Sequence, residues 1–345
     1  MRAIAERFIK NTDFTEDEFR MLVACAEDPE AAELLTQEAV RIRKKHYGDK
    51  VYIRGLIEFT NYCRNDCGYC GIRRGNRNAQ RYRLTKEQIL ECCQIGYELG
   101  FRTFVLQGGE DAWFTQERLE EIVHAIRANY GDCAITLSLG ERSRESYRRL
   151  FEAGADRYLL RHETADETHY ASLHPPELSA AHRKQCLWDL KEIGYQTGTG
   201  FMVGSPGQTA AHLARDMMFI RELEPHMVGI GPFVPHHDTP FAGEMGGSVE
   251  LVSINVDMKN GVVLDNEDML TIDDEFSVDF RTRSDEQNGE VDSLAYMTDQ
   301  QITDYFNSDN LIVYYTPKGM EIGFNFEDGW VTVTYEDYEQ FLKVF

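Results

Sequence analysis

The sequence predicts an α/β fold, a truncated parallel (βα) barrel of the TIM type with about six units, followed by a small α+β domain. Three observations lead to this prediction. Segments with strand and helix character alternate between residues 51 and 234, polar residues follow each predicted strand, and the composition changes near residue 247. Alternation of this length is typical of a parallel sheet with its helices outside.

The elements follow from local patterns. TEDEF (15–19) is a Thr-x-x-Glu capping box that predicts a helix start, and apolar residues at helical spacing extend the helical region to about residue 48. Strands are predicted at 51–59, 103–108, 134–139, 157–162, 199–204 and 227–234. Helices are predicted at 85–100, 116–131, 144–154, 180–194 and 209–224. Four of these helices end in glycine, the usual C-terminal stop.

The residues best suited to chemistry come just after the strands. In a parallel barrel these positions gather on one face, where active sites are built. Three cysteines follow the first strand, and the later strands are followed by GGED (108–111), SLGER (138–142), RHET (161–164), GSPGQ (204–208) and GPFVPHHDTP (231–240). This shared placement predicts an active site better than any one motif does.

The net charge of −23 argues against unaided binding to nucleic acid or to an anionic membrane, since phosphates need a basic surface. No run of 18 apolar residues occurs, so no transmembrane helix is expected, and the first residues have no apolar signal-peptide core. Eight cysteines without such a signal favour a reducing compartment, and we expect a cytoplasmic protein.

Composition divides the chain into two predicted domains, 1–247 and 248–345. The first holds all eight cysteines and all ten histidines, with 31 basic and 37 acidic residues. The second holds neither residue type, with 5 basic and 22 acidic residues and a net charge of −17. Such a shift marks a domain boundary. GEMGGS (243–248) is the one loose stretch between them.

Cys63, Cys67 and Cys70 form a C-x3-C-x2-C array. Thiolates hold iron–sulfur clusters, and three thiolates around a four-iron cluster leave one iron open for a small molecule. A zinc site with histidine as fourth ligand and three inert thiols are the alternatives. We interpret the other five cysteines as packing thiols, at 25, 92, 93, 133 and 186.

With Tyr69, the array resembles the C-x3-C-x-aromatic-C signature of radical S-adenosylmethionine (SAM) enzymes. The stretches 58–85, 104–111, 137–141, 154–165, 194–209 and 227–240 resemble the HydE-type maturases of [FeFe]-hydrogenase, over about residues 1–245. The resemblance implies a [4Fe–4S] cluster on Cys63, Cys67 and Cys70. The open iron would chelate SAM, and electron transfer would yield a 5′-deoxyadenosyl radical.

The resemblance also implies which residues surround SAM. Tyr69 would pack beside it, and Gly108, Gly109 and Glu110 would face the methionine amine. The remaining candidates are Ser138, Glu141, Arg161, Glu163 and Arg183, where carboxylates could hold ribose or amine and guanidinium groups could hold carboxylate.

Several of these positions have a structural alternative. Arg161 and Glu163 could form an ion pair with each other at the strand end. GSPGQ could be an ordinary turn, and His236 and His237 could touch substrate or cap the barrel rim. His162 alternates with its neighbours, so we expect it to face the helical layer.

The partners implied by the resemblance are a small iron–cysteine-type substrate, an electron donor such as ferredoxin or flavodoxin, and other hydrogenase maturases. No nucleic acid and no membrane is expected as a partner. The alternative within the family is another small-substrate reaction, of the biotin synthase or methylornithine synthase type.

The second domain does not continue the barrel. ELVSINVD (250–257) alternates like an antiparallel strand, KNG (259–261) predicts a turn, and TDQQITDYFNS (298–308) predicts a helix. Residues 312–342 predict three short strands with turns at PKG and EDG, then a short helix. Its predicted core residues are Phe324, Phe326, Trp330, Val331 and Val333.

Residues 250–345 resemble the extracytoplasmic end of RsiV-type anti-sigma factors, which senses lysozyme. This implies a binding module, whose acidic surface would suit a basic partner, or simply a solvated acidic surface. The chain would then be a fusion, or a truncated maturase joined to an unrelated domain. An open six-unit barrel would leave the first and sixth strands as unpaired edges.

Overall fold

The computed structural model describes residues 1–243, 253, 255–257, 262–265, 269–289, 292–308, 310–316, 319–326 and 329–342. The chain forms two compact units, Met1–Glu244 and Met245–Phe345. The predicted junction near residue 247, most of GEMGGS and the KNG turn lie outside the described residues. No helix among the described residues is both long and apolar enough to cross a membrane.

Unit 1 is built on a six-stranded parallel sheet in the order β1-β2-β3-β4-β5-β6. The strands are β1 (Gly55–Thr60), β2 (Thr103–Gly108), β3 (Ala134–Ser138), β4 (Arg157–Leu159), β5 (Gln196–Val203) and β6 (Met227–Pro232). Within the described residues, β1 and β6 each have one partner in this sheet. The predicted α/β architecture of an incomplete barrel is therefore confirmed, as are its two edge strands.

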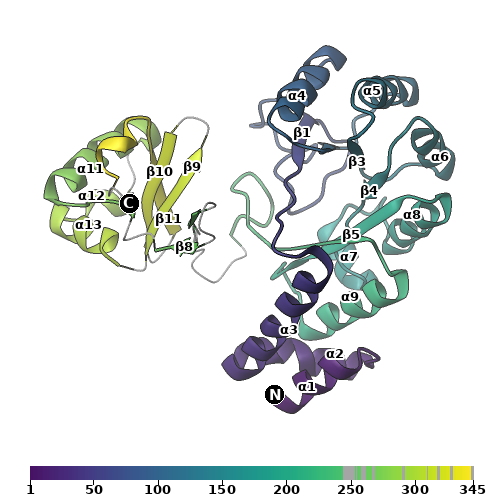
Figure 1. The fold of residues 1–345 in the computed structure, drawn as a ribbon, viewed down its shortest axis with the longest axis horizontal. Coiled ribbons are helices and arrows are strands. Elements are labelled where there is room, and N and C mark those ends of the chain that lie inside the picture. The colour runs from purple at the N-terminus through teal and green to yellow at the C-terminus, as the bar shows by residue number, and fades with distance from the viewer. Residues whose placement is uncertain are drawn as a thin grey trace. The chain divides into compact units, whose positions relative to one another are not determined.

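Five helices cover the convex side of the sheet (Figure 1). They are α4 (Lys86–Glu98), α5 (Gln116–Asn129), α6 (Arg144–Glu152), α8 (Ala180–Ile193) and α9 (Ala210–Leu223). The short helix α7 (Glu167–Leu173) contacts the loop after β1 instead. Thr85 caps α4 with Gln88 in a capping box. Gly194 ends α8 at φ +112°, which glycine adopts without a Cβ clash. The additional helix α7 was not predicted from the sequence.

One apolar core lies between the sheet and the helices. Its residues include Phe104, Leu106, Ile135, Leu137 and Tyr158, which are buried. Burying this apolar surface drives the packing of the helices on the sheet, and the packing orients the strand ends that carry the polar motifs.

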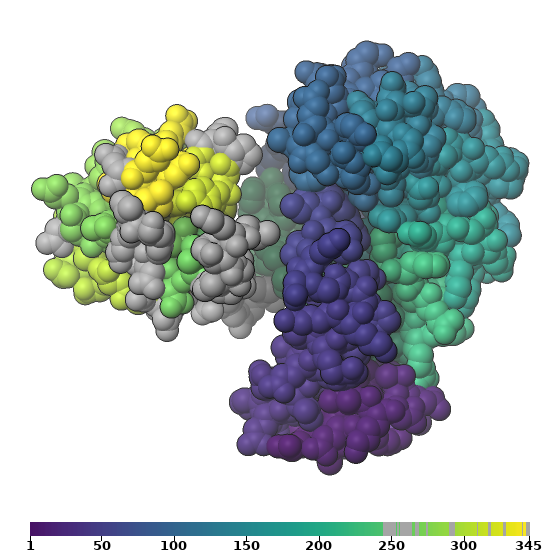
Figure 2. Space-filling view, in the orientation of Figure 1, coloured from purple at the N-terminus to yellow at the C-terminus, as the bar shows by residue number. Residues whose placement is uncertain are grey.

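Three helices precede the sheet, namely α1 (Arg2–Lys10), α2 (Glu16–Val23) and α3 (Pro29–Tyr47), with the short 3-10 helix η1 (Ala24–Glu27). They form the lower end of unit 1 in Figure 2, in purple to indigo. The predicted capping box is present, because Thr15 accepts a hydrogen bond from the Glu18 backbone and Glu18 accepts one from Thr15. Phe14 and Phe19 pack with Ala214 of α9.

Unit 2 is an α+β unit with its own core. Its antiparallel sheet has the order β11-β10-β9. Its elements are β7 (Asn255–Asp257), β8 (Val262–Leu264), α11 (Asp274–Asn288), α12 (Asp292–Ala295), α13 (Asp299–Phe306), β9 (Leu311–Thr316), β10 (Gly319–Phe326), β11 (Gly329–Tyr335) and η2 (Tyr338–Gln340). The small α+β fold is thus confirmed, while α11 was not predicted.

Three of the five predicted core residues of unit 2 are buried, namely Phe324, Val331 and Val333. The prediction for Trp330 is wrong, since its side chain is 40% exposed. Trp330 precedes Val331 on β11, and successive strand residues face opposite sides of a sheet, so the two cannot share the core. Phe326, the last residue of β10, is half-buried.

Candidate active site

The three cysteines lie in the loop after β1, each of them half-buried. The Cys70 backbone N–H donates to the Cys67 carbonyl oxygen at 3.4 Å. Burial, together with negative charge on Cys70 and Cys63, raises the pKa of Cys67 to about 12. Burial raises the pKa of Cys70 as well. A bound metal centre would offset this cost, because it binds the thiolate form and releases the protons.

Gly109, which follows β2, allows this strand end to meet the cysteine loop. A Cβ at Gly109 would lie 2.2 Å from the carbonyl oxygen of Tyr62 and 2.7 Å from Cβ of Cys63, so only glycine fits. The next residue, Glu110, also binds the loop. Its carbonyl oxygen accepts from the Arg64 backbone N–H at 3.0 Å, and its carboxylate lies 2.7 Å from the Arg64 guanidinium.

Glu110 also joins β2 to the loop after β3. Its Oε1 accepts a hydrogen bond from the Glu141 backbone N–H at 2.8 Å. Gly140 has φ +72°, and a Cβ there would lie 2.3 Å from Cγ of Glu110. Ser138 ends β3 in register with Gln107, and its hydroxyl makes no hydrogen bond among the described residues. Gly109, Glu110 and Glu141 are thus brought together, as predicted by their shared place after the strands.

Glu141 reaches across to α8. Its Oε1 lies 3.1 Å from Arg183 Nε, and both side chains are buried. This ion pair lacks hydrogen-bond geometry, because both atoms remain without a hydrogen-bond partner. Burial raises the pKa of Glu141, although the positive charge of Arg183 opposes the shift. Two buried polar atoms that lack full hydrogen bonding are suited to a polar ligand.

Glu163 follows β4 and is held in an unusual conformation. Its φ of +64° lies in the left-handed region that side chains rarely adopt, and its backbone N–H donates to Gly200 of β5 at 3.0 Å. Its Oε2 is buried and has no hydrogen-bond partner. Burial raises the pKa of Glu163, while Arg161 and Arg183 oppose the shift. Such strain and such an unpaired group are typical of functional sites.

Arg161 and Glu163 form no ion pair with each other among the described residues, so this structural alternative is not observed. The Arg161 side chain lies over β6, where a Cβ on Gly229 would be 3.7 Å from Nε of Arg161. His162 faces the helical layer, as predicted. It contacts Thr199 at 2.8 Å through Nδ1, and its Nε2 lies 3.3 Å from Asp216 of α9.

Tyr69 is held in place by a histidine that the sequence analysis missed. The Tyr69 hydroxyl lies 3.0 Å from Nε2 of His174, just after α7. Nδ1 of His174 lies 2.9 Å from the Tyr170 carbonyl oxygen, which can only accept, so Nδ1 carries the proton and Tyr69 donates to Nε2. Burial lowers the pKa of His174 to about 4, which keeps the ring neutral. The Gly68 backbone N–H also donates to the Leu173 carbonyl at 2.9 Å.

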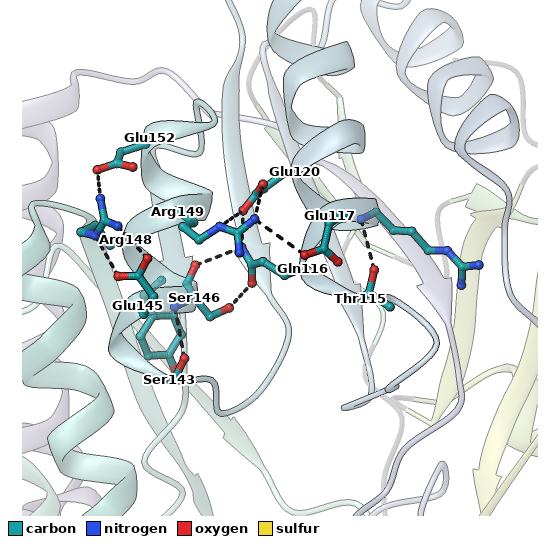
Figure 3. A network of polar contacts seen from close by, with 12 residues as sticks. Thr115, Gln116, Glu117, Glu120, Ser143, Glu145, Ser146, Arg148, Arg149 and Glu152 are labelled. Atoms are coloured by element: carbon teal, nitrogen blue, oxygen red, sulfur yellow. Dashed lines mark hydrogen bonds and ion pairs between the residues drawn. The ribbon is translucent and has the colours of Figure 1, made fainter.

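A cavity of about 580 Å³ opens beside Glu110 and Glu141. Its wall also includes Arg64 of the cysteine loop and His182 of α8. Part of the wall is a polar network between α5 and α6, in which the Ser146 hydroxyl donates to Gln116 (Figure 3). Arg149 and Glu120 stabilise this network through a bidentate ion pair. The cavity gives a small molecule access to this side of the site.

The remaining predicted positions lie around the rim. His236 packs on the cysteine loop, where a Cβ on Gly71 would be 2.6 Å from its ring. GSPGQ has the contacts of an ordinary turn, since Gln208 accepts from the Gly204 backbone and donates to the Met202 carbonyl. Four of the five cysteines outside the loop are buried packing thiols. The prediction for Cys92 is wrong, because it lies on the exposed face of α4, one residue from buried Cys93.

Comparison with known proteins agrees with this geometry. The chain is 49% identical over 219 residues to the [FeFe] hydrogenase maturase subunit HydE of Thermotoga maritima, covering 64% of this chain and 62% of the relative. It is 29% identical over 237 residues to the 3-methylornithine synthase of Methanosarcina acetivorans, covering 68% of this chain and 66% of the relative. The chain thus spans just under two thirds of the length of these relatives.

Solved structures share the fold. The crystal structure of methylornithine synthase (PylB) has a TM-score of 0.64 at 27% identity, over 70% of both chains. The crystal structure of HydG, a maturase of the [FeFe]-hydrogenase, has a TM-score of 0.60 at 23% identity, over 68% of this chain and 54% of that one. Residues 57–220 match the family model of the Radical SAM superfamily. The similarity to this superfamily thus runs from β1 to α9 of the sheet unit.

Proposed function

We propose that this chain is a radical SAM enzyme of the HydE type, which acts on a small iron–cysteine-type substrate during maturation of the [FeFe]-hydrogenase H-cluster. The observation that carries the proposal is the meeting of a three-thiol loop with the strand ends that bear Glu110, Glu141 and Glu163. The similarity to HydE supports it. We further propose a cytoplasmic location, ferredoxin or flavodoxin as electron donor, and other maturases as partners.

The residues present fit a [4Fe–4S] cluster. Three thiols stand in one half-buried loop, and negative charge on Cys70 and Cys63 raises the pKa of Cys67, which supports a shared site for the three. Cys63, Cys67 and Cys70 would hold three irons and leave the fourth open. A zinc site with histidine as fourth ligand is the weaker interpretation, because among the described residues no histidine nitrogen lies within 4.8 Å of two of these thiols in one compact ligand group.

The polar residues fit SAM. Arg183 is a buried guanidinium with Nε free of hydrogen bonds, and it would bind a carboxylate; Glu163 has a free buried oxygen, which would accept from an amine or a ribose hydroxyl. Tyr69 would flank the ligand, oriented by His174. The backbone of Gly108 and Gly109 would face the methionine amine. Arg161 and Ser138 would complete the surroundings. When bound, the cluster and SAM supply the electron transfer that cleaves a carbon–sulfur bond.

The test is conversion of SAM to 5′-deoxyadenosine by anaerobically reconstituted protein. We expect Cys67→Ala to lose bound iron and all cleavage. The matched control is Cys92→Ala, which removes an exposed thiol and should retain both. Absence of cleavage by the wild-type chain at full cluster loading would overturn the proposal for this chain.

A second candidate is a reaction of the methylornithine synthase or biotin synthase type. The shared fold with methylornithine synthase over 70% of the chain supports it. Both candidates predict SAM cleavage, so the products separate them. Incubation with lysine derivatives, with dethiobiotin and with an iron–cysteine complex should give a SAM-dependent product with only one of the three.

For unit 2 we propose a binding module of the RsiV type that recognises a basic protein such as lysozyme. Its net charge of −17 over residues 248–345 supports electrostatic attraction to such a partner. Calorimetric titration of the full chain with lysozyme at two salt concentrations tests this. We expect saturable binding that weakens with salt, and heat signals without saturation would remove this partner.

A further inference from the structure

A second cavity of unit 1 lies at the opposite edge of the sheet from the cysteine loop. It has a volume of about 1020 Å³. Its wall includes residues at the amino-terminal ends of the strands, among them Arg54 before β1, Thr103 of β2, Arg157 of β4 and Met227 of β6. The end of α3 and the segment after it complete the wall. Because parallel strands place their amino and carboxyl ends at opposite edges, this cavity is separate from the candidate active site.

The wall of this cavity is strongly basic. Five of its residues are cationic, namely Arg43, Lys50, Arg54, Arg102 and Arg157, and no Asp or Glu lies among its lining residues. Arg102 forms an ion pair with Asp132 at 3.1 Å. The other four form no ion pair within the described part of the chain. This concentration of positive charge stands out in a first domain that carries more acidic than basic residues.

Arg157 and Arg54 repel each other. Burial lowers the pKa of Arg157, and the charge of Arg54 lowers it further. The hydrogen bonds of Arg157 go to neutral groups, at 2.8 Å to Gln196 and 3.4 Å to Thr103. The neighbouring carboxylate, Asp156, is paired with Arg127 instead. Two like charges held together without an anion destabilise the protein, and a bound anion would relieve that repulsion.

The same cavity has an aromatic and apolar side. Tyr47 and Tyr52 lie on its wall with ring centroids 5.9 Å apart, and they are 58% and 66% exposed. Val51, Ile53 and Leu99 are exposed lining residues too. Large apolar side chains gathered in this way beside cations are typical of a binding surface for a ligand with both an apolar and an anionic part.

We propose that this cavity binds a polyanion that carries an aromatic group, the chemical class of nucleoside polyphosphates. The guanidinium groups of Arg54 and Arg157 would bind phosphate oxygens, for which their planar donor geometry is suited. Lys50 and Arg43 would add charge, and Tyr47 and Tyr52 would pack against the aromatic ring. The site requires neither the cluster nor SAM, so this proposal does not depend on the proposed function.

The test measures binding to the full chain with ATP, tripolyphosphate and adenosine as probes, without divalent metal and with and without saturating SAM. We expect ATP to bind more tightly than tripolyphosphate, adenosine to bind weakly, and SAM to leave ATP binding unchanged. The variant R54Q/R157Q should lose at least ten-fold in ATP affinity. The charge-matched control K10Q/R20Q removes two exposed cations that do not line the cavity, and it should bind as wild type.

A second readout separates a binding site from a structural one. Because Gln at these positions removes the repulsion, R54Q/R157Q should melt at a higher temperature than wild type without ligand. ATP should raise the melting temperature of this variant by less than it raises that of wild type. A lower melting temperature without ligand, or ATP binding equal to that of K10Q/R20Q, would overturn the proposal. R54Q alone, at an exposed position, gives the same answer should the double variant fail to fold. Equal affinity for ATP and tripolyphosphate would overturn the aromatic part.

Discussion

Glu163 combines three unfavourable features: a left-handed backbone, a buried carboxylate and an oxygen without a hydrogen bond. Native proteins retain such groups where a ligand uses them. The surrounding structure compensates only in part, through the charges of Arg161 and Arg183. The cofactor-free protein is therefore expected to be less stable than its core alone would make it.

Glu163→Gln should stabilise the cofactor-free protein at neutral pH. Burial raises the pKa of Glu163, so between the unfolded and the folded pKa the carboxyl group is protonated in the folded state and ionised in the unfolded state. The contribution of this group to stability is fully present below the unfolded pKa and is lost as the pH rises through the folded pKa. Gln removes the ionisation. We expect a rise in melting temperature of about 2–4 °C, the shift that about 1 kcal/mol produces in a domain of this size, and a flatter pH profile.

Glu120→Gln is the matched control with the opposite sign. Burial opposes ionisation there as well, but hydrogen bonds from Gln116 and Arg149 lower the pKa of Glu120. Its contribution is present above the unfolded pKa and is lost as the pH falls, so Glu120→Gln should reduce stability at neutral pH. Thermal scans between pH 5 and 8 distinguish the two variants. The same pH dependence of the melting temperature in both variants would contradict the role assigned to Glu163.

Gly109→Ala should disrupt the cysteine loop. The new methyl group would meet the Tyr62 carbonyl oxygen at 2.2 Å, and backbone cannot yield as a flexible side chain does. We expect a loss of about 2–4 kcal/mol, the size of other severe steric changes, together with poor iron loading. Gly131→Ala is the control, because its nearest neighbour would be 3.8 Å away. Denaturant unfolding and iron analysis provide the measurements.

Among the elements, the short helix α7 positions the cysteine loop. It holds the cysteine loop by two hydrogen bonds, from the Gly68 backbone to the Leu173 carbonyl and from the Tyr69 hydroxyl to His174. The Tyr170 ring stacks on His174 with centroids 3.9 Å apart, which fixes the imidazole from the other side. A short helix thus orients the loop that would carry the cluster.

This arrangement predicts that substitutions of Tyr69 and His174 have non-additive effects on SAM binding. Tyr69→Phe and His174→Phe each remove one partner of the same hydrogen bond, so each should weaken SAM binding to cluster-loaded protein by about three- to ten-fold, the worth of about 1 kcal/mol. The double variant should be no weaker than the worse single one. Dissociation constants from equilibrium binding make up the cycle. Additive losses would mean that Tyr69 and His174 act separately.

Among the described residues, each unit has a large apolar core of its own, and the N-terminal helices add two small clusters. Each of these two cores consists of residues from its own unit, so we expect each unit to unfold separately. The edge strands of unit 1 expose apolar side chains, including Leu56 of β1 and Val228 and Ile230 of β6. Unpaired edges with such residues favour self-association.

Calorimetry should therefore resolve two unfolding transitions. Phe324→Ala removes a fully buried ring of unit 2 and should destabilise that unit by about 3–5 kcal/mol, shifting only one transition. Leu137→Ala, in the core of unit 1, should shift only the other. The exposed Trp330→Ala is the control and should shift neither by much. Both transitions moving together would show that the units unfold as one.

Features that depend on neighbours in the chain could be predicted from the sequence alone. Periodicity and capping motifs indicated the six strands and most helices, and the strand–helix alternation placed the polar motifs at one edge of the sheet. The spacing of Cys63, Cys67 and Cys70 identified the candidate metal loop. These signals are local, because side-chain period and hydrogen-bond caps act within a few residues.

Which of these groups touch one another depends on the folded chain. The link from Glu110 to Glu141, the ion pair of Glu141 with Arg183 and the bond from Tyr69 to His174 join residues that lie from 31 to 105 positions apart. The basic cavity at the amino ends of the strands was equally invisible in the sequence, as its cations come from separate elements. Such contacts depend on how the helices pack on the sheet, which no local pattern specifies.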